Sequence, residues 1–399
     1  MILPLTCAGN FWYSGLMRLL FVADGRSPIA INWIRYFAER GDDVYLATTF
    51  ASTPDLPLRG LEFTPVAYSG SRRAMGRAAS AASLGAGLRT TLRRLLGPLT
   101  VSRSSRRLRD LIKRVHPDLV HAMRIPFEGM LAADAYSGAP LLVSVWGNDL
   151  TLHAPATWLM RDYTTWTLQV ANGLHADCQR DIRLSRQWGF ETTKPTLVVP
   201  GSGGIRTGVF HPPSTPAEEP VVFNPRGSRA YVRNDVWFQA ISLVLARRPD
   251  ARFVCASLAG DRQALGWIKK LGLADSVQLL PPASHNEMAG FFQRAQVAVS
   301  PTVHDGTPNS LLEAMACGCL PVASNLESVR EWITDGRNGL LMDPTSPQDL
   351  ADAILEALNR APLRHQAADL NRTIIAERAE YSLCMRQSDA FYRRLISSS

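Results

Sequence analysis

Short apolar runs alternate with longer helical spans along most of the chain, and this rhythm limits the fold more than any other feature. In the first half the apolar runs are 19–23, 44–48, 118–122 and 141–145, and residues 30–40 show a helical pattern. Apolar runs of this length, separated by helices, are typical of the strands of a parallel sheet. We therefore expect an α/β fold in this half.

A proline-rich stretch, 211–220, interrupts the pattern with neither helical nor strand periodicity, as an interdomain linker would. The alternation then begins again, and 399 residues with 46% apolar content can bury two cores. The sequence thus predicts two Rossmann-like, doubly wound domains facing a central cleft. The apolar runs of the second half are 221–224, 252–256, 277–280, 297–300 and 320–323.

The first sixteen residues lack a basic leader and a long apolar core, so we expect 1–16 to be a disordered extension. No apolar stretch approaches the roughly 20 residues that span a bilayer. The six cysteines are scattered without paired metal spacing. These features predict a cytoplasmic protein with reduced, structural thiols.

Positive charge is concentrated in residues 71–114, where twelve basic residues stand against the single acid Asp110. Leucines at helical spacing between 84 and 99 make part of this segment a basic amphipathic helix. Such a helix suits an anionic membrane surface, and an ordinary solvated face explains the pattern equally well. Nucleic acid is not expected, because the segment lacks aromatic stacking residues.

One loop carries the best indication of function. The run 297–300 is followed by small and polar residues and then by a helix start, with Asp305 and Glu313 eight positions apart. A loop that leads from a strand into a helix N-terminus presents unpaired N–H groups, which suit phosphate or sugar hydroxyls. Two carboxylates beside that place can accept hydrogen bonds from hydroxyls.

The stretch 305–318, Asp-Gly-Thr-Pro-Asn-Ser-Leu-Leu-Glu-Ala-Met-Ala-Cys-Gly, resembles the signature of the retaining GT-B glycosyltransferases of family 4, the glycosyl transferases group 1. Weaker similarities at 24–28, 116–121, 146–149 and 209–212 follow in the same order. The resemblance covers nearly all of the chain from Met17. It implies an acceptor-binding domain over 17–210, completed by a last helix at 376–399, and a nucleotide-sugar domain over 221–375.

By this resemblance Glu313 would hold the ribose hydroxyls of a nucleotide, and Asp305 would lie near the donor sugar. Asp305 is one methylene shorter than the more frequent glutamate. An alternative for Glu313 is a capping box with Ser310, in which the serine caps the helix and the glutamate reaches back. The remaining donor-binding residues implied by the resemblance form the loop and helix start Gly306, Thr307, Pro308, Asn309 and Ser310.

The family supplies an arginine and a lysine for the donor diphosphate, and Arg226 occupies the arginine position here. The lysine is missing; Arg233 is the nearest basic candidate, with Arg229 as competitor. No Asp-x-Asp pair ends a strand, so we expect no metal and no cofactor besides the nucleotide-sugar substrate.

The resemblance also places residues of the first domain beside the cleft. His121 ends an expected strand, where contact with sugar or acceptor and burial in the core are equal alternatives. Gly25 and Asp149 lie in strand-end loops on the acceptor side. We count His121 with Asp305 and Glu313 as the catalytic candidates.

The resemblance implies transfer of a hexose from a nucleotide-diphosphate sugar to a glycan, lipid-linked or small-molecule acceptor with retained configuration. That activity would suit polysaccharide biosynthesis in the cytoplasm, at the inner membrane face if the basic segment binds lipid. Alternatives are a sugar-nucleotide epimerase on the same fold and a non-catalytic sugar-nucleotide binder. A dinucleotide oxidoreductase is rejected, because residues 23–28 lack the Gly-x-Gly-x-x-Gly pattern.

Overall fold

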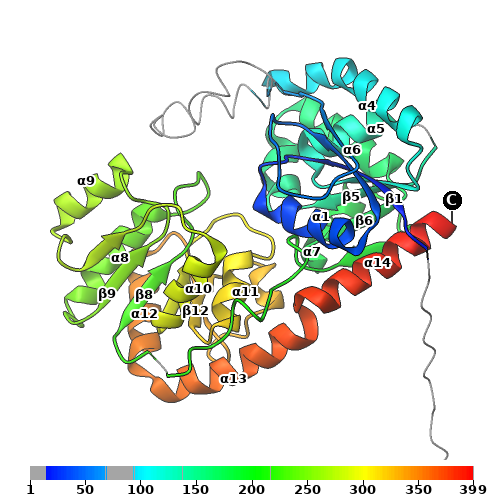
Figure 1. Cartoon of the computed structure of the whole chain (residues 1–399). Coiled ribbons are helices and arrows are strands. Elements are labelled where there is room, and N and C mark those ends of the chain that lie inside the picture. The colour runs from blue at the N-terminus through cyan, green and yellow to red at the C-terminus, as the bar shows by residue number, and fades with distance from the viewer. Residues whose placement is uncertain are drawn as a thin grey trace, which may run out of the picture.

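Two parallel β-sheets organise the chain, one in each of two lobes (Figure 1). This computed structural model describes residues 15–67, 69, 93, 95–136, 138–215 and 217–398. Most of the expected extension, 1–14, and most of the basic segment between 71 and 94 lie outside the described residues. The predicted fold class, two Rossmann-like domains of α/β type, is confirmed.

The sheet of the first lobe has the strand order β3-β2-β1-β4-β5-β6-β7, all parallel. The order changes direction between β1 and β4, so the loops after these two strands diverge and leave a crevice at their carboxyl ends. Its strands are β1 Arg18–Ala23, β2 Asp43–Thr48, β3 Gly60–Phe63, β4 Leu119–Ala122, β5 Leu141–Val145, β6 Gly173–Ala176 and β7 Thr196–Val198. The α-helices are α1 Pro28–Arg40, α4 Val101–Val115, α5 Met130–Asp134, α6 Trp158–Val170 and α7 Gln179–Gln187.

The second sheet has the order β10-β9-β8-β11-β12-β13 and is also parallel. Here the direction changes between β8 and β11. The strands are β8 Val221–Asn224, β9 Arg252–Cys255, β10 Val277–Leu279, β11 Val297–Ser300, β12 Leu320–Ser324 and β13 Leu340–Met342. The helices are α8 Asn234–Leu245, α9 Arg262–Leu271, α10 His285–Arg294, α11 Asn309–Ala316, α12 Pro347–Asn359 and α13 Ala361–Arg378.

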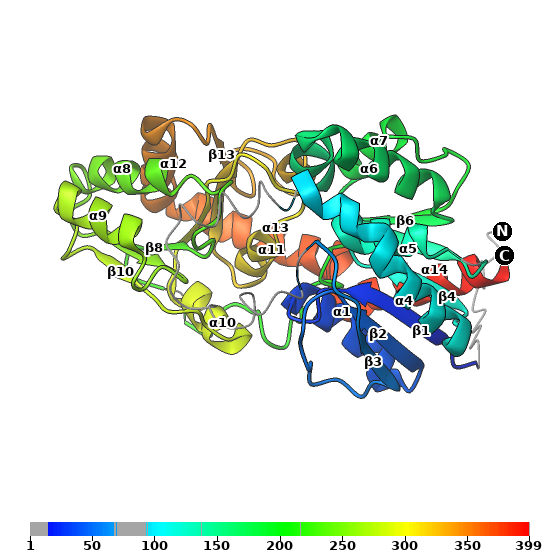
Figure 2. The same cartoon turned by 90° about the horizontal axis from the view of Figure 1, so that it is seen from above.

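The chain returns to the first lobe through its last helix, α14, Tyr381–Ser397, which follows α13 and lies against that lobe (Figures 1 and 2). The buried Tyr392 anchors it: its ring stacks on Phe37 of α1 at 4.6 Å between centroids, and its hydroxyl accepts a hydrogen bond from Trp33 Nε1 at 2.8 Å. The same hydroxyl lies 2.5 Å from His121 Nδ1. Aromatic packing and a buried polar network therefore hold the C-terminal end on the first lobe.

We expect Tyr392→Phe to lower the free energy of unfolding by about 1–3 kcal/mol, because Trp33 Nε1 and His121 Nδ1 lose their buried partner. Chemical denaturation followed by tryptophan fluorescence measures the loss. Tyr136→Phe is the matched control, since that side chain is exposed, and it should change little. Equal stability of both variants would contradict the importance of this network.

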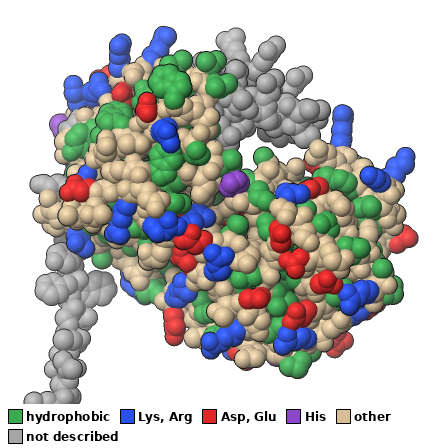
Figure 3. Space-filling model, turned by 180° about the vertical axis from the view of Figure 1, so that it is seen from behind, with side chains coloured by type: hydrophobic (Ala, Val, Ile, Leu, Met, Phe, Trp, Pro, Cys, Tyr) green, Lys and Arg blue, Asp and Glu red, His purple; other side chains and the backbone are tan. Residues whose placement is uncertain are grey.

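No described helix combines the length and the apolar character that a crossing of the bilayer requires. In the described part of the basic segment, α4 buries its apolar face, including Leu108 and Leu111, and exposes Arg103, Arg106 and Arg107. Figure 3 shows Lys and Arg side chains interspersed with hydrophobic ones on the first lobe, at the upper left. The described part of the segment thus has a core face and a charged outer face.

Candidate functional site

The loops that bear the donor-binding candidates come from the two central strands of the second sheet. Arg226 follows β8, and the loop 301–308 follows β11, the strand beside it. Because the sheet order changes direction between these strands, their loops border the crevice in which open α/β sheets bind ligands. The structure therefore brings Arg226, Asp305 and the start of α11 together, although 79 residues separate the first two.

Helix α11 begins at Asn309 directly after this loop, with Pro308 as the residue before it and no side chain capping its N-terminus. The capping box considered for Ser310 and Glu313 is therefore wrong. Ser310 lies inside the first turn, and its hydroxyl accepts a hydrogen bond from Arg226 Nη1 at 3.1 Å. The N–H groups of Asn309 and Ser310, with the positive end of the helix dipole, suit a bound anion.

Asp305 and Arg226 form a largely buried ion pair, with Arg226 Nη2 2.5 Å from Asp305 Oδ2. Their side chains are 14% and 6% exposed. Arg226 Nε is buried without a hydrogen-bond partner in the described residues. The guanidinium thus has one N–H group that the described residues leave unpaired.

Glu313 lies one turn further along α11 and lines a pocket between the lobes together with Asn309, Asn32, Arg206 and His285. Burial raises the pKa of its carboxyl to about 7, and the positive charge of Arg226 offsets part of this effect. Among the described residues nothing forms a hydrogen bond with the carboxyl. A partly buried carboxyl without a protein partner is suited to accept hydrogen bonds from hydroxyls of a ligand.

The second cation is less well placed than Arg226. Arg233 forms a two-point ion pair with Asp235 at the start of α8, through Nε at 2.8 Å and Nη2 at 2.7 Å. Arg229 donates to Tyr231 Oη at 3.3 Å and is exposed. Arg206 was not predicted from the sequence. It lines the same pocket as Glu313, and its guanidinium carbon lies 3.8 Å from the centroid of the Tyr381 ring. It stands outside every similarity named above, so only the folded chain identifies it.

His121 does not face the cleft, which corrects that expectation. Its side chain is 1% exposed, and its ring nitrogens lie 2.5 Å from Tyr392 Oη and 2.8 Å from Ser144 Oγ. Burial moves its pKa well below the ordinary value, and the neighbouring His175 adds to this effect. His121 is a neutral core histidine at the centre of the α14 network.

Gly25 and Asp149 lie at the carboxyl edge of the first sheet. Gly25 N donates to Thr48 Oγ1 at 3.0 Å, and a Cβ on this glycine would come within 2.3 Å of Ser52 Oγ. Asp149 is 1% exposed; its carboxylate accepts hydrogen bonds from Arg124 Nε at 2.9 Å and Trp146 N at 3.1 Å. Asp149 therefore holds its own loop in place and does not face solvent. Its partners Arg124 and Trp146 line the adjoining pocket.

This pocket has a volume of about 300 Å³ and lies in the first lobe, on the side where the acceptor is expected. Burial raises the pKa of Glu128, and the charge of Arg93 opposes this rise. The pocket offers both charges and aromatic rings to a polar ligand. Lining residues include Asp24, Phe50, Arg93, Arg124, Glu128 and Trp146.

One group of side chains in the described residues has ligand atoms close enough for a metal ion: Asp177, Cys178 and Asp181, all within 4.8 Å. They lie at the start of α7, and Asp181 is already paired with Arg180 at 2.7 Å. Burial raises the pKa of the Cys178 thiol, with the neighbouring Asp177 adding to the effect. The ion pair with Arg180 accounts for the position of Asp181 without a metal ion. The expectation that the protein uses no metal stays a prediction.

Two family models match the chain, and together they cover both lobes. Residues 225–360 match glycosyl transferases group 1, and residues 27–201 match the glycosyl transferase 4-like domain. The first model contains Arg226, Asp305 and Glu313, and the second contains Asp149 and His121. Each model falls on the lobe for which the resemblance predicted it.

Curated relatives include a D-inositol 3-phosphate glycosyltransferase from Paenarthrobacter aurescens, 34% identical over 143 residues, or 35% of each chain. Another from Mycolicibacterium smegmatis is 28% identical over 190 residues, 45% of this chain and 43% of the relative. The match with the first of these thus spans about a third of the relative's length.

Solved structures share the fold over almost the whole length. A sucrose-phosphate synthase from Thermosynechococcus elongatus has a TM-score of 0.74 at 16% identity, covering 96% of this chain and 99% of the other. The Anabaena protein HepE, solved with UDP, has a TM-score of 0.70 at 15% identity, covering 95% and 100%. At these identities the likeness shows the two-lobed fold.

Proposed function

Because the chain belongs to the glycosyl transferases of group 1 and has their GT-B fold, we propose that it transfers a hexose from a nucleotide-diphosphate sugar to an acceptor with retained configuration. The single observation that carries the proposal is the Glu313 carboxyl in α11, which is partly buried, lies near Arg226 and has no hydrogen-bond partner among the described residues. A ribose would satisfy the carboxyl, and a diphosphate would satisfy Arg226 and the first-turn N–H groups.

In this mechanism the chain positions the substrates and stabilises charge. The acceptor hydroxyl approaches the same face of the sugar from which the diphosphate departs, and the departing phosphate removes its proton. Arg226 and the α11 dipole stabilise the developing negative charge, and Asp305 lies between Arg226 and the sugar. The pocket around Arg124 and Glu128 would hold the acceptor.

The experiment is nucleoside diphosphate release from a panel of UDP-, GDP- and ADP-sugars, with glycans, lipid-linked sugars and phosphorylated polyols as acceptors. HepE binds UDP and UDP-glucose, so UDP-sugars come first. Release of diphosphate with a new glycoside supports transfer. Conversion of the donor sugar without release supports the epimerase, and binding without turnover supports the non-catalytic binder; either result would overturn the proposal.

We also propose that the first lobe contacts an anionic membrane surface at the inner face, which would suit a lipid-linked acceptor. Leu95, Leu99 and Trp158 are exposed, at 48%, 64% and 71%, and Arg103 and Arg106 of α4 are exposed nearby in the sequence. Basic and apolar side chains together favour anionic lipid, each cation contributing about 1 kcal/mol.

Co-sedimentation with vesicles containing phosphatidylglycerol is expected to pellet the protein, whereas pure phosphatidylcholine vesicles are not. Reversing charge in Arg103→Glu with Arg106→Glu should reduce the pelleted fraction several-fold. The same double change at Arg247 and Arg330, which lie exposed on the second lobe, is the control. Identical soluble fractions with both kinds of vesicle would refute the membrane contact.

A further inference from the structure

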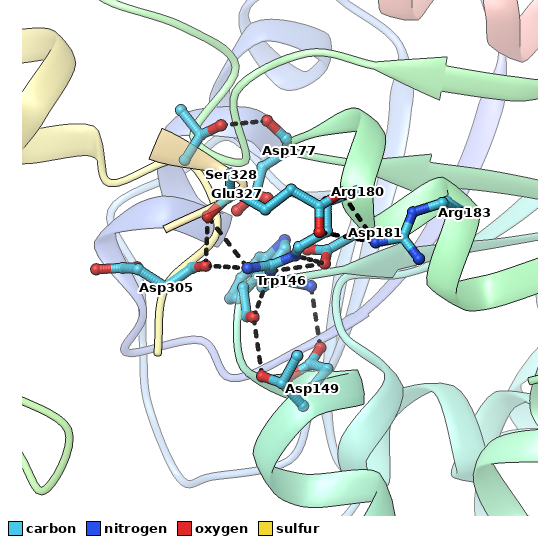
Figure 4. A network of polar contacts seen from close by, with 12 residues as sticks. Trp146, Asp149, Asp177, Arg180, Asp181, Arg183, Asp305, Glu327 and Ser328 are labelled. Atoms are coloured by element: carbon cyan, nitrogen blue, oxygen red, sulfur yellow. Dashed lines mark hydrogen bonds and ion pairs between the residues drawn. The ribbon is translucent and has the colours of Figure 1, made fainter. Parts of the chain in front are cut away.

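The guanidinium of Arg180 lies at the contact between the two lobes, within the network drawn in Figure 4. Arg180 is the second residue of α7 in the first lobe, and its side chain is 9% exposed. Nη1 donates to the backbone oxygen of Asp305 at 2.6 Å and to Ser328 Oγ at 3.1 Å, both in the second lobe. One side chain of the acceptor domain therefore holds the donor loop by its backbone.

The same guanidinium also holds a loop of its own lobe. Nη2 donates to the backbone oxygen of Gly147 at 2.8 Å, and Asp181 pairs with Nε and Nη2 at 2.8 and 2.7 Å. Gly147 belongs to the loop 146–149, in which Trp146 lines the first-lobe pocket. Because Asp181 neutralises and orients the guanidinium, its remaining donors point to two backbone carbonyls, one beside each substrate site.

The two loops touch through glycines at this place. A Cβ on Gly147 would lie 2.3 Å from Gly306 N, and a Cβ on Gly306 would lie 2.3 Å from Asp177 Oδ1. Thr307 Oγ1 donates a hydrogen bond to the backbone oxygen of Asp177. The backbones of the two loops are so close that neither Gly147 nor Gly306 could carry a side chain. This contact fixes the position of one loop relative to the other.

The second lobe in turn fixes the helix that carries Arg180. The Glu331 carboxylate accepts hydrogen bonds from the N–H groups of Gln179 and Arg180, at 2.8 and 2.9 Å. A carboxylate from one lobe thus caps the N-terminus of a helix in the other. Both sets of contacts exist only while the lobes are together.

We propose that Arg180 is a positioning residue that couples closure of the lobes to the geometry of the donor loop. When the lobes meet, Arg180 fixes the Asp305 carbonyl relative to the Gly147 carbonyl, while Arg226 holds the Asp305 carboxylate from the other side. The donor sugar and the acceptor are thereby brought into register. This inference deepens the proposed function and depends on it.

The test compares Arg180→Ala with Arg183→Ala. Arg183 is the matched control because it also joins the lobes, through Glu327 at 2.8 Å, but it is half exposed and holds no substrate loop. With the nucleotide sugar that the wild type selects, we expect Arg180→Ala to lower kcat about 30-fold or more. The dissociation constant of the nucleoside diphosphate, measured by calorimetry, should change by less than about threefold.

Three further measurements separate positioning from loss of structure. Arg180→Lys should recover little, because an ammonium cannot make this set of bonds. Added guanidinium at millimolar concentration should restore part of the activity of Arg180→Ala and none to Arg183→Ala. Small-angle scattering with nucleoside diphosphate present should show a more open Arg180→Ala than wild type, with melting temperatures within a few degrees.

Equal kcat values for Arg180→Ala and Arg183→Ala would overturn the inference. So would a loss of nucleotide affinity as large as the loss in kcat, because Arg180 would then act on the nucleotide. A wild type that turns over no donor would instead refute the proposed function, and the scattering comparison would then decide by itself whether Arg180 holds the lobes together.

Discussion

Arg226→Ala is expected to lower kcat/KM for donor turnover about 100-fold or more, equivalent to about 3 kcal/mol of transition-state stabilisation. Arg226 is buried at the switch point of the second sheet, and its Nε has no partner among the described residues. In the proposed function its guanidinium meets the leaving diphosphate. Steady-state kinetics of nucleotide release measure the effect.

Arg226→Lys should recover only part of this loss, since an ammonium keeps the charge but cannot bind two phosphate oxygens side by side. Arg247→Ala, on an exposed arginine paired with Asp352 in the same lobe, is the control and should retain wild-type kinetics. If Arg226→Ala kept more than a third of the wild-type kcat/KM while Arg247→Ala did the same, Arg226 would have no part in the reaction.

Glu313→Ala is expected to weaken nucleoside diphosphate binding about 10- to 100-fold, because two charge-assisted hydrogen bonds to the ribose are lost. The variant should stay folded, since the carboxyl has no partner in the described part of the chain to leave unpaired. Titration calorimetry gives the dissociation constants. Glu356→Ala, on the exposed face of α12, should bind as the wild type does. Undiminished affinity in Glu313→Ala would refute the ribose contact.

The raised pKa of Glu313, about 7, adds a dependence on pH. Because the folded-state pKa lies above the ordinary value of 4.5, the stability that the protonated carboxyl contributes is complete below about pH 4.5 and is lost as the pH rises through 7. The unliganded protein should therefore lose thermal stability between pH 5 and 8, whereas nucleotide affinity should increase as the carboxylate forms. Glu313→Gln should remove the rise in affinity and reduce the loss of stability, part of which remains because burial also raises the pKa of Asp181, to about 6.

Much of the architecture could be predicted because parallel sheets leave a strong pattern. The runs at 19–23, 44–48 and 297–300 are apolar except for Thr48 and Ser300 at their ends, and they correspond to β1, β2 and β11. Four short strands were missed, namely β3, β6, β7 and β13. Strand β6 contains a histidine, and β7 and β13 have only three residues each. Each of these strands is placed by pairing with the strand beside it in the sheet, which no local pattern reveals.

The closeness of the donor-binding candidates on one loop and helix start was predictable for a different reason. Asp305, Glu313 and the residues between them lie in one continuous stretch, so a single loop and helix start place them all. Residues that act across the lobes were not predictable. Arg180 and Arg206 reach the site only through the packing of the lobes, and in a chain with many arginines neither stands out.

His121 was counted as a catalytic candidate, and the structure places it in the core instead. A histidine at the end of a central strand could point to the cleft or into the core, and the sequence left both open. The deciding partner is Tyr392, 271 residues away on the returning helix α14. Burial of such a group is a property of the whole first lobe and could not be read from the strand.

The most direct measurement of the central claim is a crystal structure of the protein with the nucleoside diphosphate that it binds best. We expect the ribose hydroxyls within about 2.6–3.2 Å of the Glu313 carboxylate and the phosphates between Arg226 and the N–H groups of the first turn of α11. A nucleotide bound elsewhere, or one in this pocket that touches neither Glu313 nor Arg226, would contradict the account.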